Sequence, residues 1–341
     1  MLNAVYRLVA PRRFEVEFND IDLYGNQMVV RPTHLSICHA DQRYYQGTRP
    51  AEVMKRKLPM ALIHEGIGEV VHDPTGTYQV GDTVIMIPNI PAGEDTVIAE
   101  NYLLDSRFRA SSFDGFMQEH VVMAPDRAVP LLPGTDRVVA AFTELVSVSV
   151  HSIRRFDRFA HTRRDIIGVW GDGNLGFLTA LCIRVMQPES RLYIFGVDSG
   201  KLAQFSFADA VFLVSDVPED VLVDHAFECV GGQASQHAIE QMIDHVQPEG
   251  TLSLMGVSEY PVPINTRMVL EKGLRFYGSS RSGREDFLET VEIYRKHPEI
   301  VRHFSNIVGA RVPIHSIEDM NRAFELDISR GMGKTVMMWD V

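Results

Sequence analysis

The fold is decided by residues 165–176, which read Asp165-Ile166-Ile167-Gly168-Val169-Trp170-Gly171-Asp172-Gly173-Asn174-Leu175-Gly176. The apolar run up to Trp170 predicts a buried parallel strand. A complete G-x-G-x-x-G motif follows it, and such glycines permit a tight turn, close backbone approach to a pyrophosphate and close packing of helix on strand. The free N–H groups at the start of the following helix favour an anion. The stretch therefore predicts a dinucleotide-binding loop.

The residues after this loop continue the same pattern. Apolar positions at helical spacing follow it: Leu175, Leu178, Leu181, Cys182 and Val185. Short apolar runs come next, at residues 192–195, 210–214, 223–227 and 251–255. This alternation predicts repeated strand–helix units, and so an α/β fold with a doubly wound parallel sheet. A glycine loop alone is also compatible with a structural turn, but the order strand, loop, helix, strand favours nucleotide binding. The residues expected to contact the nucleotide here are Gly171, Gly173, Asn174, Leu175 and Gly176.

An acidic residue lies where the second strand is expected to end, in Val197-Asp198-Ser199-Gly200-Lys201. An acid at this distance from the glycine loop usually binds the adenosine ribose hydroxyls, which favours NAD over NADP. Ser199 and Lys201 could instead meet a 2′-phosphate if Asp198 turned away. A solvated turn carboxylate is the plain alternative. The residues alone leave the choice of nucleotide open.

The segment before residue 138 has a different character. Short β-branched runs alternate with turn signals such as Gly25-Asn26, Asp73-Pro74-Thr75-Gly76 and Val80-Gly81-Asp82, so mostly short strands and turns are expected. A length of 341 residues also indicates two domains rather than one. We predict a mostly-β domain from residues 1–144 and 279–341, and a nucleotide-binding domain from residues 145–278.

Composition excludes several classes of protein. Apolar residues make up 45% and charged residues 23% of the chain, as in ordinary globular enzymes. No apolar run is long enough to span a bilayer, and no secretory signal is recognised, so a cytoplasmic location is expected. The formal net charge of −12 argues against binding to nucleic acid or an anionic membrane. A phosphorylated substrate would need a local cationic pocket. Three cysteines without a CxxC pair indicate no disulfide framework.

Four residues of the first domain could hold a metal. They are Cys38, His64, Glu65 and Glu144. One thiolate, one imidazole and one or two carboxylates make a plausible open zinc site, able to polarise a carbonyl. Asp41 could orient a ligand from behind. Each residue has a plain explanation alone, because a lone cysteine in an apolar run is usually buried and inert. The combination with a nucleotide fold favours zinc.

Together these residues resemble the medium-chain dehydrogenase/reductase superfamily, the zinc alcohol and polyol dehydrogenases. The landmarks are Cys38 with Asp41, Ile63-His64-Glu65-Gly66-Ile67-Gly68, Val80 to Val84, Asp114-Gly115-Phe116 and the glycine loop. The resemblance covers essentially the whole chain. It implies a GroES-like catalytic domain, a Rossmann domain and a homodimer. It also implies that Cys38, His64 and Glu65 are zinc ligands or their neighbours, and that Glu144 is a further ligand or a water-holding carboxylate. Residues 86–115 contain no cysteine, so the structural zinc of the superfamily is expected to be absent.

Longer strings resemble one branch of this superfamily, the ribulose-5-phosphate reductases that make ribitol 5-phosphate for wall teichoic acids and capsules. The strings are residues 38–47, 73–78, 224–229, 255–260 and 278–284. The resemblance implies zinc-dependent reduction of D-ribulose 5-phosphate, and a biosynthetic reaction favours NADPH, with NADH the alternative that Asp198 suggests. Association with the cytidylyltransferase that consumes the product is a further implication of the branch.

Two roles stay open in this comparison. The Ser or Thr that often relays the proton is Ala40 here, so water, His39, Tyr44 or another group must protonate the product. Arginine suits the substrate phosphate because its planar fork offers several donors. The candidates are Arg281, Arg284, Arg43 and Arg49.

Two other functions compete with the reductase. An NAD-dependent zinc polyol dehydrogenase of the sorbitol or xylitol type is favoured by Asp198 and disfavoured by the arginines at 281 and 284. A catalytically silent dinucleotide-binding protein is disfavoured by the intact set of metal-ligand residues.

Overall fold

The computed structural model describes residues 1–341, and the chain divides into two compact units. The first consists of Met1–Ser147 with Ser282–Val341, and the second of Val148–Arg281. The sequence placed the boundaries after residues 144 and 278. The structure places the first boundary inside a helix, α4 (Thr143–Phe159), so no turn marks it.

The second unit is built on a six-stranded sheet in the order β13-β12-β11-β14-β15-β16, and every pair is parallel. Its strands are β11 (Ile166–Trp170), β12 (Arg191–Gly196), β13 (Ala210–Leu213), β14 (Val223–Glu228), β15 (Val246–Leu254) and β16 (Arg275–Gly278). Its helices are α5 (Asn174–Met186), α6 (Ser199–Leu202), α7 (Ser235–His245) and α8 (Thr266–Glu271). Because the strand order reverses at β11, the glycine loop after β11 lies at the switch point where nucleotides bind. The predicted doubly wound sheet is confirmed.

Aromatic packing in this unit explains one glycine of the predicted strand. The Trp170 ring stacks on Phe195 of the neighbouring strand, with the ring centroids 3.8 Å apart and the planes at 6°. A Cβ on Gly168 would lie 2.5 Å from a ring atom of Trp170. A side chain at residue 168 would therefore clash with the Trp170 ring in this position.

The first unit contains three sheets. The largest has the order β10-β6-β5-β3-β18-β17 with β9 beside β3; the others are β2-β1-β4 and β7-β8. The strands are β1 (Leu2–Ala10), β2 (Arg13–Asp20), β3 (Met28–Ser36), β4 (Met60–Ala61), β5 (Glu65–His72), β6 (Thr83–Met86), β7 (Asn89–Ile90), β8 (Arg107–Phe108), β9 (Val121–Met123), β10 (Ala128–Pro130), β17 (Val308–Ile314) and β18 (Lys334–Trp339).

The helices of the first unit lie at its edges and in its returning segment. They are α1 (His39–Tyr45), α2 (Ala51–Lys57), α3 (Arg137–Ala140), α9 (Arg284–Lys296), α10 (Pro298–Phe304) and α11 (Ile317–Ile328), with short 3-10 turns η1 (Glu100–Tyr102), η2 (Pro125–Arg127) and η3 (Ser305–Ile307). The expectation of mostly strands and turns before residue 138 missed α1 and α2. Each has seven residues, too few for a helical period to stand out from the sequence.

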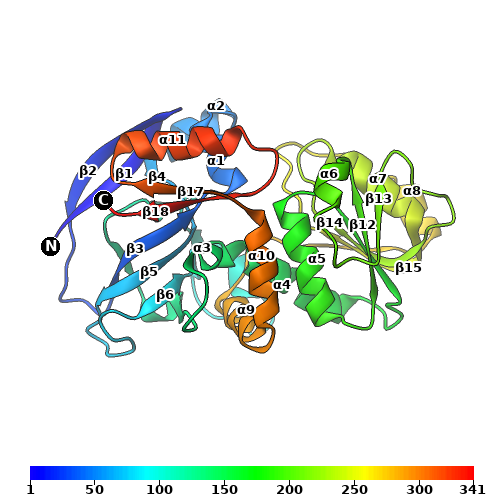
Figure 1. The fold of residues 1–341 in the computed structure, drawn as a ribbon, viewed down its shortest axis with the longest axis horizontal. Helices are drawn as coiled ribbons and strands as arrows, with labels where there is room; N and C mark the ends of the chain where they lie inside the picture. The colour runs from blue at the N-terminus through cyan, green and yellow to red at the C-terminus, as the bar shows by residue number, and fades with distance from the viewer. The chain divides into compact units, whose positions relative to one another are not determined.

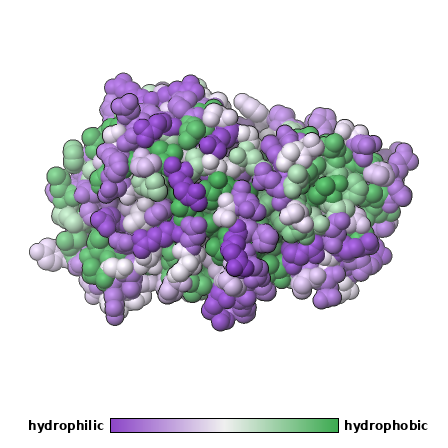
Figure 2. Space-filling view, viewed as in Figure 1, coloured by the Kyte–Doolittle hydropathy of each residue, from purple (hydrophilic) through white to green (hydrophobic).

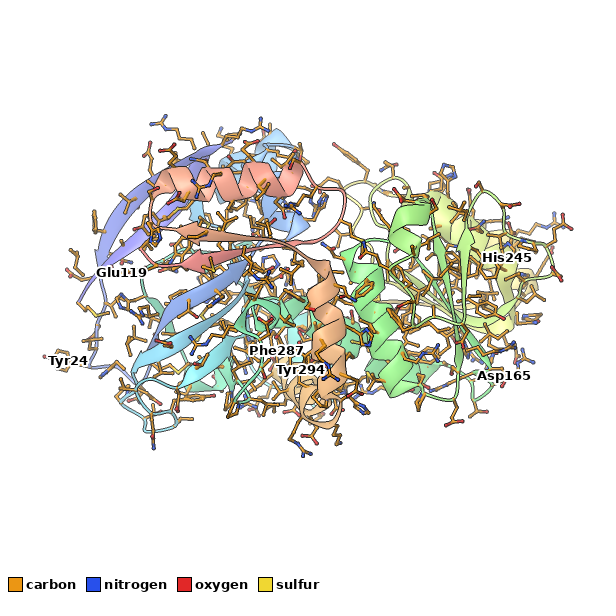
Figure 3. The ribbon with its side chains drawn as sticks, in the orientation of Figure 1. Tyr24, Glu119, Asp165, His245, Phe287 and Tyr294 are labelled. Carbon is orange, nitrogen blue, oxygen red and sulfur yellow. The ribbon has the colours of Figure 1, made fainter.

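The returning segment completes the core of the first unit. In Figure 1, α11 lies over the strands β17 and β18, with which it packs. Its Phe324 ring stacks on Tyr45 at the end of α1, with centroids 4.6 Å apart, and also contacts Phe14 of β2. Phe287 and Tyr294 of α9 are buried in the same unit (Figure 3). The aromatic contact of Tyr45 fixes α1, which begins directly after Cys38.

The cysteine-free segment 86–115 is held by an ion pair whose arginine is buried. The guanidinium of Arg127 donates to the Glu100 carboxylate at 2.9 Å, and the Arg127 side chain is only 6% exposed. The same carboxylate accepts the backbone N–H of Arg284 at 2.8 Å. The ion pair therefore ties η1 to η2 and to the start of α9.

The surface is that of a charged globular protein. Figure 2 shows polar residues over most of the viewed face, with apolar residues in small groups between them. None of the helices has both the length and the apolar character that crossing a bilayer requires.

Candidate zinc and nucleotide sites

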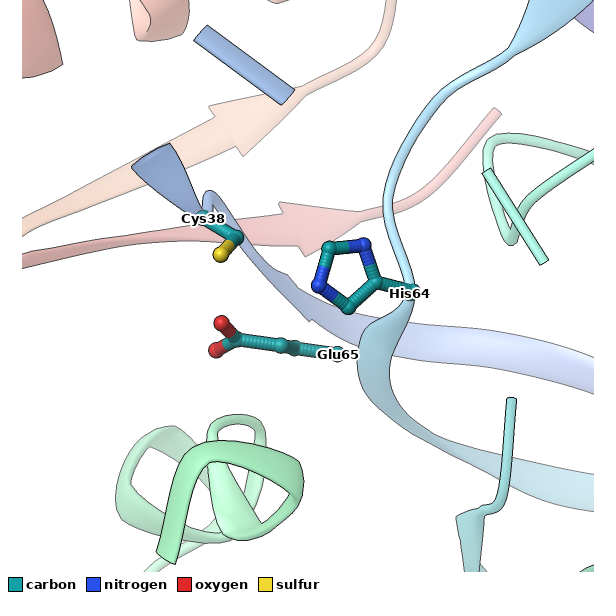
Figure 4. A group of neighbouring side chains, drawn as sticks. All are labelled: Cys38, His64 and Glu65. Carbon is teal, nitrogen blue, oxygen red and sulfur yellow. The ribbon is translucent and has the colours of Figure 1, made fainter. Parts of the chain in front are cut away.

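Strand pairing brings three predicted ligands together. Cys38 follows the end of β3 and is the N-cap of α1, while Glu65 is the first residue of β5. The two strands are antiparallel, with Ser36 opposite Glu65. The ligand atoms of Cys38, His64 and Glu65 consequently all lie within 4.8 Å of one another (Figure 4).

Asp41 organises this group from one side. Its carboxylate is fully buried and accepts the backbone N–H groups of Cys38 at 3.2 Å and Ile63 at 3.1 Å. Ile63 has φ +71°, a left-handed conformation that an isoleucine adopts only when its surroundings impose it. The same carboxylate oxygen that holds Ile63 lies 3.6 Å from Nδ1 of His64. Figure 4 shows the other ring nitrogen of His64 directed toward Cys38 and Glu65.

Lys334 is a site residue that the sequence analysis missed. It opens β18, is 2% exposed, and lies with its ammonium 2.9 and 2.8 Å from the two Glu65 oxygens. It also donates to the backbone carbonyl of Ile37 at 2.7 Å. The signal available in the sequence is a lysine at the start of a mostly apolar strand, Lys334–Trp339.

The electrostatics of the group favour a protonated thiol and a protonated imidazole, so a bound metal would displace a proton from each. Burial raises the pKa of the Cys38 thiol, although the neighbouring His64 opposes this shift. Burial would lower the pKa of His64, but Asp41 and Cys38 together raise it well above its ordinary value. A thiolate and a neutral imidazole are the forms that bind zinc, and a divalent cation favours both. Thiolate, imidazole and carboxylate donors in a buried group, with a carboxylate behind the imidazole, fit a zinc ion.

Glu144 lies outside the close group of three. It is in the first turn of α4 and is 5% exposed. Burial raises the pKa of Glu144 to about 7, and the nearby His64 works in the opposite direction. The structure therefore brings together three of the four predicted ligands and leaves Glu144 within electrostatic reach of them.

The glycine loop has the geometry of a pyrophosphate site. Gly171 has φ +127°, and a Cβ on Gly176 would lie 1.9 Å from the carbonyl oxygen of Gly171, so neither position accepts a side chain. A Cβ on Gly173 would meet no protein atom within 4 Å. The first backbone bond at this end of α5 runs from the Phe177 N–H to the Gly173 carbonyl. The N–H groups of residues 174–176 precede that bond, and the open space beside Gly173 fits the phosphates of a dinucleotide.

Asp198, the predicted ribose ligand, also has a structural role. It is the N-cap of α6, and its Oδ1 accepts the N–H groups of Gly200 and Lys201. The buried Asp172 of the glycine loop accepts the N–H groups of Val197 and Asp198 at 2.8 and 2.9 Å. Asp172, which the sequence analysis passed over, thus ties the glycine loop to the turn carrying Asp198, Ser199 and Lys201.

The remaining predicted site residues lie either on and directly after α1 or in the segment 281–284. Tyr44 is buried in α1, and the guanidinium of Arg49 lies 4.1 Å from its ring centroid. Arg43 is half-buried on the same helix. Arg284 begins α9, and its Nε donates to the Asp126 carbonyl at 2.9 Å. Arg281 belongs to the second unit and has φ +60°.

Comparison with known proteins agrees with this geometry. Residues 25–133 match the alcohol dehydrogenase GroES-like domain, and residues 209–296 match the zinc-binding dehydrogenase family. The chain is 56% identical to the ribulose-5-phosphate reductase of Bacillus spizizenii over the full length of both proteins. It is 51% identical to ribulose-5-phosphate reductase 2 of Staphylococcus aureus, again over both full lengths. The crystal structure of S. aureus TarJ in complex with NADPH superimposes with a TM-score of 0.90 at 48% identity, covering all of both chains.

The chain belongs to the zinc-binding alcohol dehydrogenase family, in the branch that contains the ribulose-5-phosphate reductases. The predicted resemblance and the predicted combination of a GroES-like domain with a Rossmann-type domain are confirmed. The chain is accordingly an NAD(P)-dependent oxidoreductase of the zinc type.

Proposed function

We propose that this enzyme reduces D-ribulose 5-phosphate to D-ribitol 5-phosphate with NADPH and one zinc ion. The observation that carries the proposal is the buried group of Cys38, His64 and Glu65 in a chain 56% identical to a named ribulose-5-phosphate reductase over its whole length. The bound NADPH of S. aureus TarJ supports the choice of nucleotide.

The metal would be held by Cys38, His64 and Glu65, with Glu144 as a further ligand. A zinc ion bound there supplies a Lewis acid for the C2 carbonyl of the ketose. Asp41 holds the backbone of Cys38 and faces Nδ1 of His64, so it positions both ligands. Lys334 balances the charge of Glu65 and fixes the direction of its carboxylate.

The nucleotide would lie on the second unit. Gly171, Gly173, Asn174, Leu175 and Gly176 would contact the pyrophosphate. The reduced nicotinamide supplies the hydride. Ser199 and Lys201, on the turn that Asp198 caps through its Oδ1, would face the adenosine ribose and its 2′-phosphate.

Proton delivery cannot use a hydroxyl at residue 40, which is alanine. We propose that His39, Tyr44 or a water molecule delivers the proton, because both side chains follow the metal ligand Cys38 on α1. His39 lies on the exposed side of α1 and reaches solvent, while Tyr44 is buried.

The decisive test is steady-state oxidation of NADPH and NADH with D-ribulose 5-phosphate, followed by absorbance, with and without a zinc chelator. We expect chelator-sensitive turnover that zinc restores, and a higher kcat/KM for NADPH. Absence of turnover by protein shown to carry zinc would refute the proposed reaction.

The competing proposal is an NAD-dependent polyol dehydrogenase acting on an unphosphorylated sugar alcohol. The observation that favours it is the acidic residue Asp198 at the end of β12, where NAD-dependent folds place one. Assays with sorbitol, xylitol and ribitol beside ribitol 5-phosphate, each with NAD and NADP, separate the two. Preference for an unphosphorylated polyol with NAD would establish this second function.

We further propose that the enzyme is a cytoplasmic homodimer that serves teichoic acid or capsule synthesis and associates with a ribitol-5-phosphate cytidylyltransferase. These proposals rest on the resemblance to the reductase branch. Light scattering of the purified chain, alone and mixed with such a cytidylyltransferase, tests the assembly.

A further inference from the structure

We propose that His39, Arg43 and Arg49 form a phosphate-binding face beside the metal ligands, and that this face takes the C5 phosphate of the sugar substrate. The assignment of the substrate rests on the proposed function. Such a face suits a phosphate dianion. Because the nucleotide also carries phosphates, the experiment must distinguish the sugar phosphate from the nucleotide phosphates.

The first argument is the orientation of α1. Its inward residues, Asp41, Gln42, Tyr44 and Tyr45, are all buried. His39 and Arg43 are four residues apart, so they lie next to each other on the opposite side of the helix. His39 is exposed and Arg43 half-buried, whereas Cys38 caps the start of the same helix. An imidazole and a guanidinium therefore follow the metal ligand along one outward face.

The second argument is that Arg49 is already positioned. Its Nη2 donates to the backbone carbonyl of Ala40 at 3.3 Å, and its guanidinium lies over the Tyr44 ring. The turn before Arg49 is tied to α1 because the N–H of Thr48 donates to the carbonyl of Arg43 at 3.0 Å. The guanidinium is thus held against the backbone of Ala40, which is two residues after Cys38. A planar group fixed in this way loses little entropy when it binds a phosphate.

The third argument is length. Five bonds separate the C2 carbon of ribulose 5-phosphate from its phosphorus, about 6 Å in an extended chain. An α-helix rises about 1.5 Å per residue, so Arg43 lies about 7 Å along α1 from Cys38. A ketose whose carbonyl lies at the metal ligands can therefore place its phosphate against this face.

The fourth argument is charge. Residues 39–57 hold five Arg or Lys and two acidic residues, in a chain of formal charge −12. Of those two acids, Asp41 is turned inward to the N–H groups of Cys38 and Ile63. The nearest other acidic side chain on the packed elements is Asp327 of α11. Asp327 accepts a hydrogen bond from Gln42, so its charge is partly satisfied. The segment is a local positive region of the kind that a dianionic substrate requires.

The other two candidate arginines are placed less favourably. The Nε of Arg284 donates to the carbonyl of Asp126, and its backbone N–H donates to Glu100. Arg281 lies in the second unit, whereas the metal ligands lie in the first. Arg43 and Arg49 alone among the four arginines share a helix and its following turn with a metal ligand.

The test uses Arg49→Gln and Arg43→Gln in the zinc-loaded enzyme. Arg31→Gln is the matched control, because Arg31 is exposed in the same unit and pairs with Glu69. We expect KM for ribulose 5-phosphate to rise about tenfold or more in both variants, the loss of one charge-assisted contact. Zinc content, KM for NADPH and kcat/KM for unphosphorylated D-ribulose should stay at wild-type values. Inorganic phosphate should inhibit the wild type competitively and the variants more weakly.

Three other outcomes would contradict the substrate assignment, the phosphate-binding face or the proposed reaction. A rise confined to KM for NADPH would assign the face to the nucleotide and refute the substrate assignment. Wild-type KM values in both variants would refute the face altogether. If the wild type does not turn over ribulose 5-phosphate, the proposed reaction fails, and calorimetric titration with inorganic phosphate then decides whether Arg43 and Arg49 bind phosphate. Arg49→Lys retains the charge without the planar fork and should give an intermediate KM, which keeps the test valid if the glutamine variant folds poorly.

Discussion

The ion pair between Lys334 and Glu65 is almost completely removed from water. Their side chains are 3% and 0% exposed, and the ammonium also donates to the carbonyl of Ile37, next to Cys38. Burial lowers the pKa of Lys334, but Glu65 and Cys38 raise it above its ordinary value. Lys334 therefore keeps its charge in the interior, and it links β18 to the metal ligands that follow β3 and open β5.

We predict that Lys334→Met destabilises the protein strongly. Loss of one member of a buried pair leaves the other charge unpaired, at a cost of about 3 kcal/mol or more. The matched control is Arg12→Met, which breaks an exposed pair with Glu325 and should cost about 1 kcal/mol or less. Urea unfolding of both variants after removal of zinc, which would otherwise compensate the charge of Glu65, measures both costs. Equal effects of the two substitutions would show that burial adds nothing to the Lys334 pair.

The sequence predicted the metal ligands but not the side chains that contact them. Cys38, His64 and Glu65 were predictable because thiol, imidazole and carboxylate are the usual ligands of zinc. Lys334 was not, since it lies 269 positions from Glu65 and only the pairing of β18 with β3 brings it there. The division of labour between Glu65 and Glu144 also depends on distances that residue types do not contain.

Among the elements, the loop between β11 and α5 carries the strictest local requirements. The positions of Gly171 and Gly176 have no room for a side chain, whereas Gly173 has open space beside it. The sequence predicted this loop correctly because every requirement lies within a dozen consecutive residues. It did not predict that Asp172 fixes the following turn, since that contact spans 25 positions.

We predict opposite consequences for two substitutions in this loop. Gly176→Ala should destabilise the second unit, because the new methyl group would meet the carbonyl of Gly171. Gly173→Ala should fold normally but raise KM for NADPH, because its methyl group fills the space left for the pyrophosphate. Thermal unfolding and steady-state kinetics distinguish them. A normal KM in folded Gly173→Ala would place the nucleotide elsewhere.

A second element-scale feature is His225, a buried histidine that joins β14 to its neighbours. Its Nδ1 accepts the N–H of Thr251 in β15, so its Nε2 must donate to the carbonyl of Arg163. Burial, followed by His161, lowers the pKa of His225 to about 4. The folded state therefore favours the neutral imidazole.

We predict that this histidine makes stability fall with acid. A lowered pKa contributes stability that is present above the ordinary pKa of histidine and is lost as pH falls toward 4. Between about pH 7.5 and about pH 5 the loss should be about 2 kcal/mol. Urea unfolding at both values should show that His225→Gln is less stable at neutral pH but loses less on acidification. The exposed His237→Gln is the control and should follow the wild type. An identical pH dependence of His225→Gln and the wild type would contradict the assignment.

On the scale of the whole molecule, the metal ligands and the glycine loop belong to different units with their own cores. The largest sheet of the first unit joins N-terminal and C-terminal parts of the chain, because β18 pairs with β3. The exposed Tyr24 (Figure 3) and the half-buried ligand Cys38 belong to one unit with the C-terminal strand.

We predict that zinc and nucleotide stabilise separate parts of the chain. Removal of zinc should speed amide hydrogen exchange around residues 36–41 and 63–66 and in β18, because bound metal adds its binding energy to that unit. Exchange in β11 and α5 should respond to NADPH and not to the chelator. Mass spectrometry of exchange in the four states, with and without each ligand, measures this. Loss of protection in α5 on zinc removal alone would contradict independent stabilisation.

The class of fold, the glycine loop and the chemical types of the metal ligands were predictable from the order of residues alone. Each depends on local order or residue chemistry, such as the run of Ile166 to Gly176 or the thiol of Cys38. Three contacts became visible only in the folded chain: Lys334 pairs with Glu65, Asp198 caps α6, and Arg49 packs on α1. These contacts join residues through strand pairing and helix packing, and long-range pairing is set by the burial of the whole core rather than by any single stretch.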